Sequence, residues 1–402
     1  MSAPPDTGRR NQQVMAAVVF VVFAAFAFVI PFLPLYVREL GVAEADVATW
    51  SGLLIAVAPL FAGLLAPVWG RLADRYGHKV MATRGLVSYV VILSLSALVA
   101  NVGQLLGLRI AVGLFGGIGP LSITMASASA PRGEAGRAIG LMQAAQILAA
   151  AVGPFLGGLL AVTIGIRPTF VVTAVLCGLA FLLVHLAYVD PPRRDPSPDA
   201  AAAAPMGLPR GPLLGLMALL FLLNFVSRSF TPVLPQQIEG LGVASGRVAL
   251  ATGVLVSFYS IAAAASAGLL GRSPERWPPR RVMLASVSAA ALLLAPIPWL
   301  TTFPALLAVA TLLGLVFGGS LTLGYTIGDR LAPGERRGTV FGYFTGAALF
   351  GGAVSPFIAG LLARWDLAAI YYLDAAICVF VATVLALAGP LRPGAAAVAS
   401  RS

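Results

Sequence analysis

Four charged residues could do chemistry within segments that are otherwise apolar. Arg109 and Arg228 lie inside such segments, Asp374 lies in the last of them, and Asp329 lies at the end of another. In a membrane span a charge is costly unless it is paired or hydrated, and it commonly marks an ion or proton pathway. A desolvated carboxyl near a restoring charge can take up and release a proton. We therefore predict that these four residues take part in proton coupling.

Alternatives remain for each of them. Asp374 and Arg228 are expected at similar depth, so we predict that they pair, and a structural ion pair without proton traffic would explain them equally. Arg109 lies about a turn and a half from the end of its segment, so it either faces a cavity or extends towards the headgroups. Glu39, Glu44 and Asp46 are interpreted as solvated loop charges.

Composition places these charges in a membrane protein. Of 402 residues, 59% are hydrophobic and only 10% are charged, against about 25% charged in soluble domains. This balance excludes a soluble enzyme, a disordered scaffold and a disulfide-stapled domain. Cys177 and Cys378 lie inside apolar runs, so neither disulfides nor a thiolate metal site is expected. The net charge of +11 comes from small groups of basic residues between apolar runs, which argues against nucleic-acid binding.

Twelve apolar segments account for the chain, and each is long enough to span a bilayer. We expect an all-α membrane protein with two six-helix bundles, at 14–188 and 213–390, joined by a cytoplasmic linker at 189–212 and flanked by cytoplasmic tails at 1–13 and 391–402. The predicted spans are 14–36, 48–69, 80–100, 104–126, 139–162, 168–188, 213–235, 248–268, 282–299, 305–328, 339–362 and 369–390.

Basic residues predict the orientation of these spans. With the N-terminus in the cytoplasm, twenty basic residues fall in inner loops and tails, and only four fall in outer loops. Because positive charge is retained on the cytoplasmic side, we expect both termini to be cytoplasmic.

The two halves are related by an internal repeat. PFLPLYVRELG from Pro31 matches PVLPQQIEGLG from Pro232 at a shift of 201, as Cys177 matches Cys378, and Pro154 matches Pro356 at a shift of 202. A duplicated unit of six spans has the same topology in both copies, with a binding site expected at their interface and alternating access by rocking.

The loop after the second predicted span has residue types suited to a conformational latch. In GRLADRYGHK, Gly70 permits close helix packing, Gly77 a tight turn, and Asp74 can interact with a helix N-terminus. Arg75 and Lys79 can bridge to carboxylates, although topology-setting charge alone would also explain them. This loop resembles the cytoplasmic signature of the major facilitator superfamily, whose pattern implies that Asp74 meets the start of span eleven near Thr339 in the outward-facing state.

Two further patterns carry the same resemblance. The run from Ala149 through Gly153, Pro154, Gly157 and Gly158 is similar to a signature of antiporters in this superfamily, although a generic small-residue interface is the alternative. Leu106, Arg109 and Gly113 are similar to a span-four motif, with Val112 in place of its glutamine.

The resemblance also implies which spans line the cavity. Polar and aromatic residues at mid-depth on those spans would suit lipophilic molecules of varied shape, and helix packing is the alternative for each. The candidate substrate-binding residues are Phe26, Gln143, Gln146, Asn224, Arg228, Phe258, Tyr259, Phe317, Tyr343 and Phe344.

The resemblance to twelve-span bacterial multidrug exporters predicts a proton-coupled antiporter for small lipophilic compounds. We expect it in the cytoplasmic membrane as a monomer, with a small-molecule substrate, protons and lipid as partners, and with neither metal nor cofactor beyond the proton gradient. Alternatives are a carrier for a sugar, metabolite or siderophore and, more remotely, a membrane-embedded enzyme, for which no catalytic motif is present.

Overall fold

The first half of the chain forms a bundle of helices. The computed structural model describes residues 5–129, 135–190, 210–272, 277–331 and 337–387. In the first half it contains α1 (Pro5–Ala27), η1 (Ile30–Phe32), α2 (Leu33–Glu39), α3 (Glu44–Tyr76), α4 (His78–Ser96), α5 (Val102–Phe115), α6 (Ile118–Ala128), α7 (Ala135–Thr163) and α8 (Ile166–Ala187).

The second half repeats this order. It contains α9 (Arg210–Arg228), α10 (Leu234–Gly240), α11 (Ser245–Arg272), α12 (Pro279–Leu294), η4 (Ile297–Trp299), α13 (Phe303–Phe317), α14 (Ser320–Leu331), α15 (Arg337–Leu362) and α16 (Ala368–Leu387). The starts of α3 and α11, and of α5 and α13, are related by the shift of 201 that the sequence predicts. Gly41 and Gly242 occupy the same repeat position and both have positive φ, at 81° and 79°. The repeat is therefore a repeat of structure.

Predicted spans of the first half are interrupted at two places by residues that disfavour a continuous helix, and the seventh and tenth predicted spans break at the equivalent places, between α9 and α10 and between α13 and α14. The first begins at Pro5, before the predicted start at Val14, and breaks into α1, η1 and α2 around Pro31 and Pro34. The fourth breaks between α5 and α6 at Gly116 and Gly117. In the described chain, eleven helical segments are long and apolar enough to cross a membrane, and Val102–Phe115 is a shorter apolar helix at the fourth predicted span.

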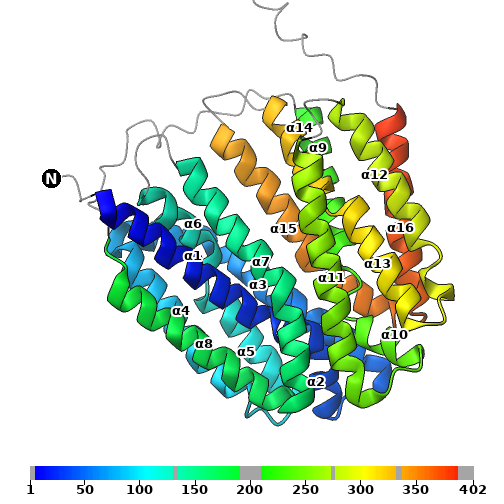
Figure 1. Ribbon diagram of the computed structural model, residues 1–402, viewed down its shortest axis with the longest axis horizontal. Helices are drawn as coiled ribbons and strands as arrows, with labels where there is room; N and C mark the ends of the chain where they lie inside the picture. The colour runs from blue at the N-terminus through cyan, green and yellow to red at the C-terminus, as the bar shows by residue number, and fades with distance from the viewer. Residues whose placement is uncertain (1–4, 130–134, 191–209, 273–276, 332–336, 388–402) are drawn as a thin grey trace, which may run out of the picture.

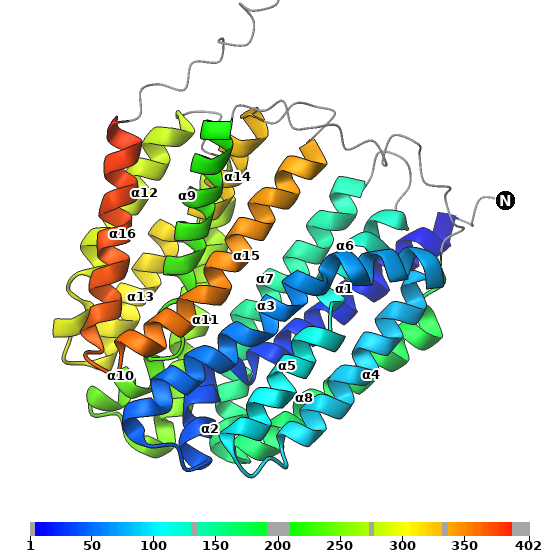
Figure 2. The same cartoon turned by 180° about the vertical axis from the view of Figure 1, so that it is seen from behind.

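Each half has its own hydrophobic core. One core contains residues from α1 to α8, including Tyr36, Phe170 and Cys177. The other is built almost entirely from α9 to α16. Figures 1 and 2 show the helices of the two halves converging near α2 and α10 and diverging towards the opposite end, where the upper ends of α7 and α15 lie apart.

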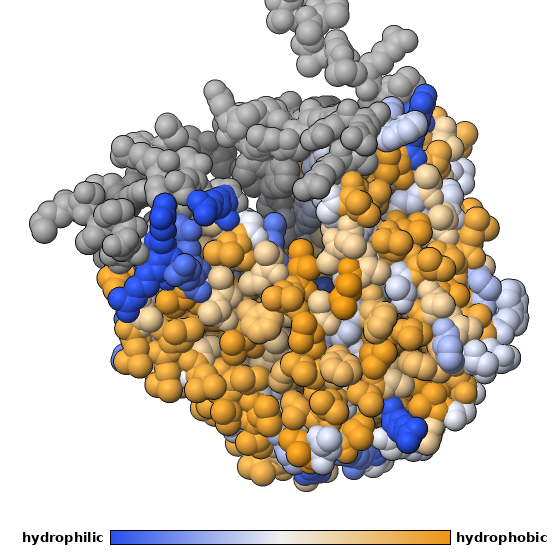
Figure 3. Space-filling view, in the orientation of Figure 1, coloured by the Kyte–Doolittle hydropathy of each residue, from blue (hydrophilic) through white to orange (hydrophobic). Residues whose placement is uncertain are grey.

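The molecular surface has the character of a lipid-facing protein. Many large apolar side chains are exposed, among them Leu98, Leu186 and Trp365. Figure 3 shows hydrophobic residues over the middle of one face, with hydrophilic residues gathered at its upper margin and near its lower rim. Such a belt is expected where hydrocarbon is the solvent.

Candidate functional site

The two bundles meet along a seam in which glycine lets helix backbones touch. On α11, a Cβ added to Gly253 would lie 2.3 Å from the Pro154 carbonyl oxygen on α7. On α7, a Cβ added to Gly158 would lie 2.7 Å from the Ala249 carbonyl oxygen. The Phe155 amide also donates to Ser257 Oγ at 3.0 Å. Pro154 and Gly158, which the sequence singles out, are therefore direct contacts between the bundles.

The other side of the seam repeats this arrangement between α3 and α15. A Cβ on Gly52 would lie 2.0 Å from the Pro356 carbonyl oxygen, and one on Gly360 would lie 2.3 Å from that of Ala48. Thr49 Oγ1 donates to the Gly360 carbonyl at 2.9 Å. Gly52 and Gly253, like Pro154 and Pro356, occupy equivalent repeat positions, so the two crossings are related by the pseudo-twofold axis.

The remaining glycines of the α7 motif face inward within their own bundle. A Cβ on Gly153 would lie 2.6 Å from Ala27 Cβ, and one on Gly157 would lie 2.4 Å from Phe28 Cα. The motif thus packs α7 against α1 on one face and against α11 on the other. A helix held between two neighbours in this way can transmit movement of one bundle to the other.

Asp374 is the most deeply buried carboxyl of the site. It lies on α16 at 0% exposure. Its Oδ2 accepts a hydrogen bond from Ser229 Oγ, and its Oδ1 has no hydrogen-bond partner. The predicted ion pair with Arg228 is wrong for this conformation: within the described residues no ion pair joins them, and Arg228 is exposed whereas Asp374 is enclosed.

Two other predicted residues of the second half lie around Arg228, and one of them, Tyr259, also lies near Asp374. Asn224 and Arg228 lie one turn apart on α9, and both lie close to Gly352 of α15. Tyr259 of α11 packs edge-on against Phe230 and lies near both Arg228 and Asp374. The cluster is lined by an amide, a guanidinium and a phenol, so it can offer donors to an acceptor group on a ligand.

Arg109 is buried in the first bundle at 4% exposure, and its Nη2 has no hydrogen-bond partner. Gly113, one turn further along α5, packs on the Ala58 carbonyl of α3. Arg109 therefore points into the protein rather than towards the headgroups. An unpartnered donor on a buried cation is available to an anion or a carbonyl.

The other predicted substrate contacts divide between core and surface. Phe317 and Phe344 are buried in the core of the second half, and the Phe344 ring fills the space beside Gly328. Phe26 stacks edge-to-face with Tyr89 at a centroid distance of 4.9 Å. Gln143, Phe258 and Tyr343 are exposed, and Gln146 is half-buried. In this conformation, therefore, Phe317 and Phe344 are enclosed by the second bundle, whereas Gln143, Phe258 and Tyr343 are accessible to solvent.

At the end opposite the closed seam, the predicted latch loop contacts its own bundle. Lys79 Nζ donates to the Tyr188 carbonyl at 2.7 Å, and the Lys79 amide donates to Asp190 Oδ1 at 3.1 Å. Asn11 Nδ2 donates to the Val189 carbonyl at 2.7 Å, while Asn11 Oδ1 accepts from the Val189 amide. These bonds fasten α1 and α4 to the end of α8, where the predicted linker begins.

Tyr188 belongs to the same cluster, and its hydroxyl lies 3.4 Å from Ser129 Oγ. Arg75 is exposed. The side chains of Asp74 and Asp329, the surroundings of Gly70, most of the predicted linker and the C-terminal tail lie outside the part of the chain that the structure describes.

Charges that the sequence analysis assigned to solvated loops prove to join the bundles. Arg38 Nη1 contacts Glu239 Oε1 at 2.9 Å, Gln236 Nε2 donates to Glu44 Oε1 at 3.0 Å, and Arg364 Nη2 contacts Asp46 Oδ1 at 3.0 Å. Glu44 and Asp46 are solvated as predicted, with side chains 60% and 40% exposed, but they also contact the other bundle, which the sequence analysis did not predict. The repeat offers a signal for the first pair, since Arg38 and Glu239 are exactly one repeat apart.

Comparisons with known proteins agree with this architecture. Among solved structures, the chain is similar to a bacterial homolog of the human lysosomal transporter Spinster (TM-score 0.75, 16% identity, 96% of each chain). It is also similar to the nucleoside transporter NupG (TM-score 0.76, 12% identity, 94% of this chain and 99% of that one). At these identities the likeness shows the fold alone.

Sequence relatives are closer. Multidrug resistance protein MdtG of Enterobacter lignolyticus is 30% identical over 385 residues, covering 94% of this chain and 92% of that protein. MdtG of Salmonella dublin is 29% identical over 382 residues, with 94% of each chain covered. The family model described as Major Facilitator Superfamily matches residues 15–253 and 216–401. The chain is a multi-pass membrane transporter and belongs to the Major Facilitator Superfamily.

Proposed function

We propose that this protein exports small lipophilic compounds across a bacterial cytoplasmic membrane in exchange for protons, acting as a monomer with both termini in the cytoplasm. The cargo class is supported by the likeness to multidrug resistance proteins over 94% of the chain. The observation that carries the mechanism is the α7 motif, whose Pro154 and Gly158 form the contact between the bundles.

The orientation supports an inward-facing state. The charge bias along the sequence assigns the loops after α2 and α10 to the outside, and the seam contacts cluster towards those loops. With the outer end closed and the inner ends of α7 and α15 apart, cargo enters the site from the cytoplasm. Rocking of the bundles then exposes the same site to the outside.

The proton is assigned to Asp374. A carboxylate fully enclosed by protein, with one unpartnered oxygen, is costly in its charged form. Protonation removes that cost and leaves Ser229 as a hydrogen-bond partner. The nearby donors of Asn224, Arg228 and Tyr259 offer a place where cargo and the proton can influence each other, which antiport requires. Arg109 supplies a buried cation in the first half.

The proposal is tested in everted membrane vesicles with a panel of lipophilic dyes and an imposed pH gradient, in which the vesicle interior is acidic. The expected result is that dye accumulates in the vesicles and that its uptake partly dissipates the gradient. Vesicles without the protein provide the baseline. Dye uptake that is the same with and without the pH gradient would indicate a facilitator. Transport of a sugar in place of dyes would indicate the alternative carrier.

A further inference from the structure

An ion pair between α2 and α10 crosses the closed end of the protein. The Arg38 guanidinium donates through Nε and Nη2 to both carboxylate oxygens of Glu44, at 2.9 and 2.7 Å, within its own bundle. Its remaining nitrogen, Nη1, reaches Glu239 of the other bundle at 2.9 Å. The side chains of Arg38 and Glu239 are 32% and 25% exposed. Arg38 is therefore held by one bundle and shared with the other.

The positions of Arg38 and Glu239 in the repeat place this ion pair near the pseudo-twofold axis. They are separated by 201 residues and occupy the same place in PFLPLYVRELG and PVLPQQIEGLG. Two equivalent positions can touch each other only near the axis that interchanges the two halves. Identical charges at that place would repel, whereas an arginine and a glutamate attract across it. The pair therefore lies where the bundles must part if the outer end opens.

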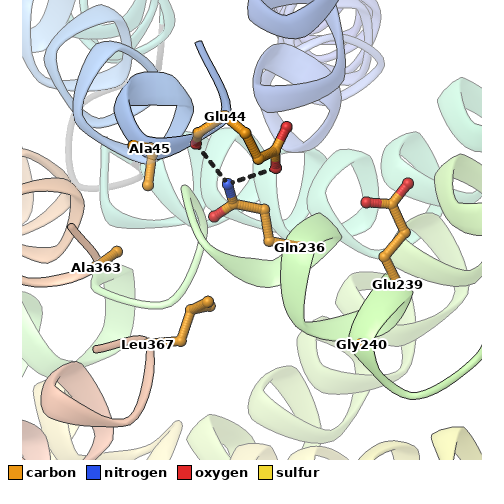
Figure 4. A pocket seen from close by; sticks show the side chains of 8 residues that line it. Glu44, Ala45, Gln236, Glu239, Gly240, Ala363 and Leu367 are labelled. Carbon is orange, nitrogen blue, oxygen red and sulfur yellow. Dashed lines mark hydrogen bonds between the residues drawn. The ribbon is translucent and has the colours of Figure 1, made fainter. Parts of the chain in front are cut away.

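Helix α10 is itself fastened to the second bundle. The Tyr371 hydroxyl on α16 donates to Gln237 Oε1, and Tyr371 lies one turn before Asp374. On either side of Gln237, Gln236 reaches Glu44 and Glu239 reaches Arg38. Figure 4 shows the Gln236 and Glu44 contact beside a cavity of about 380 Å³ that Ala45, Glu239 and Ala363 also line. A displacement of α10 would therefore be transmitted to α16, the helix that carries the buried carboxyl of Asp374.

We propose that Arg38 and Glu239 form a charge latch on the pseudo-twofold axis, which holds the outer side shut and breaks each time the outer side opens. The bidentate contact with Glu44 keeps the Arg38 charge compensated after release, while Glu239 passes into water. The latch rests on the proposed orientation, in which this end is the outer one, but not on the identity of the cargo.

Cross-linking of the closed end tests the latch without any cargo. In the full-length protein with Cys177→Ala and Cys378→Ala, the reporter pair Ala45→Cys and Ala363→Cys lies across the cavity from α3 to the end of α15. Oxidative cross-linking is measured as a fraction of membrane-inserted protein. We expect Glu239→Gln, which leaves the Arg38 and Glu44 contact intact, to lower the ratio of closed to open protein by about fivefold, the effect of losing a half-buried ion pair, and to slow cross-linking by up to that factor.

A double-mutant cycle shows whether the two residues act through each other. Arg38→Gln is expected to slow cross-linking like Glu239→Gln, and the double variant no more than either. Arg167→Gln removes an outer charge whose contacts, with the Ala97 carbonyl and the Tyr36 ring, lie within the first bundle, and it should leave the rate unchanged. An unchanged rate in Glu239→Gln, or additive effects in the double variant, would overturn the latch. If the cycle behaves as expected while dyes are not exported, the proposed function fails and the latch stands.

Discussion

The seam between the bundles can be perturbed by a single methyl group. Gly253→Ala would place a Cβ 2.3 Å from the Pro154 carbonyl oxygen, 3.0 Å from its carbon and 3.3 Å from Phe155 Cα. All three atoms belong to the backbone of α7, so no side-chain rotation relieves the overlap. An ordinary contact would require α7 and α11 to separate by about 1 Å at this point.

The cost of that separation follows from the packing of helix on helix. Overpacking a close contact costs about 1–3 kcal/mol, and each 1.4 kcal/mol changes an equilibrium about tenfold. The penalty falls on the conformation in which the seam is closed, so its population should drop about fivefold to 150-fold relative to the outward-open one. Export should fall correspondingly, because the inward-facing state that loads cargo becomes rare.

The assay combines dye export in everted vesicles with cross-linking of the Ala45→Cys and Ala363→Cys pair. Gly268→Ala on the same helix is the matched control, because a Cβ there meets nothing within 4 Å. Both substitutions raise helix propensity equally, so their difference isolates the seam. Equal export and equal cross-linking in the two variants would refute the assignment of this contact to the closed state.

Two further perturbations test other contacts. Asp374→Asn keeps an acceptor for Ser229 but cannot exchange a proton. Dye uptake driven by the pH gradient should therefore be lost, while dye-for-dye exchange persists. Asp366→Asn, at an exposed position, serves as the control, and gradient-driven uptake in Asp374→Asn would contradict the proton assignment. Asn11→Ala removes both hydrogen bonds to Val189 and should destabilise the purified protein by about 1–3 kcal/mol. Its melting temperature in detergent should be lower than that of the control variant Gln13→Ala. Equal melting temperatures would show that the contact at the end of α8 contributes little to stability.

Features that depend on long runs of sequence could be predicted. Apolar runs, prolines and the 201-residue repeat predict the spans, and the structure repeats its helix starts at the same shift. A close helix contact at Gly158 could be anticipated, because a residue without a side chain lets two helix backbones approach each other. That α7 touches both α1 and α11 required the structure.

Features that depend on rotation about a helix axis could not be predicted. Depth suggested Arg228 as the partner of Asp374, but depth does not say which way a side chain points, and Ser229 takes that place. Phe317 and Phe344 face the core. The sequence could not predict this, because in a membrane protein the core and lipid faces of a helix are both apolar and leave no periodic signal. The contacts of Glu44 and Asp46 with the other bundle could not be predicted, because their partners there, Gln236 and Arg364, are distant in sequence.

The central claim is that two equivalent bundles open one side of the membrane at a time. Spin-label distances in the full-length protein test it most directly, with one pair at Ala45 and Ala363 at the closed end and another at Gly140 of α7 and Leu269 of α11 at the opposite end. The account predicts that Glu239→Gln or Gly253→Ala lengthens the first distance and shortens the second. Distances that lengthen together, or a second distance that stays fixed while the first changes, would contradict it.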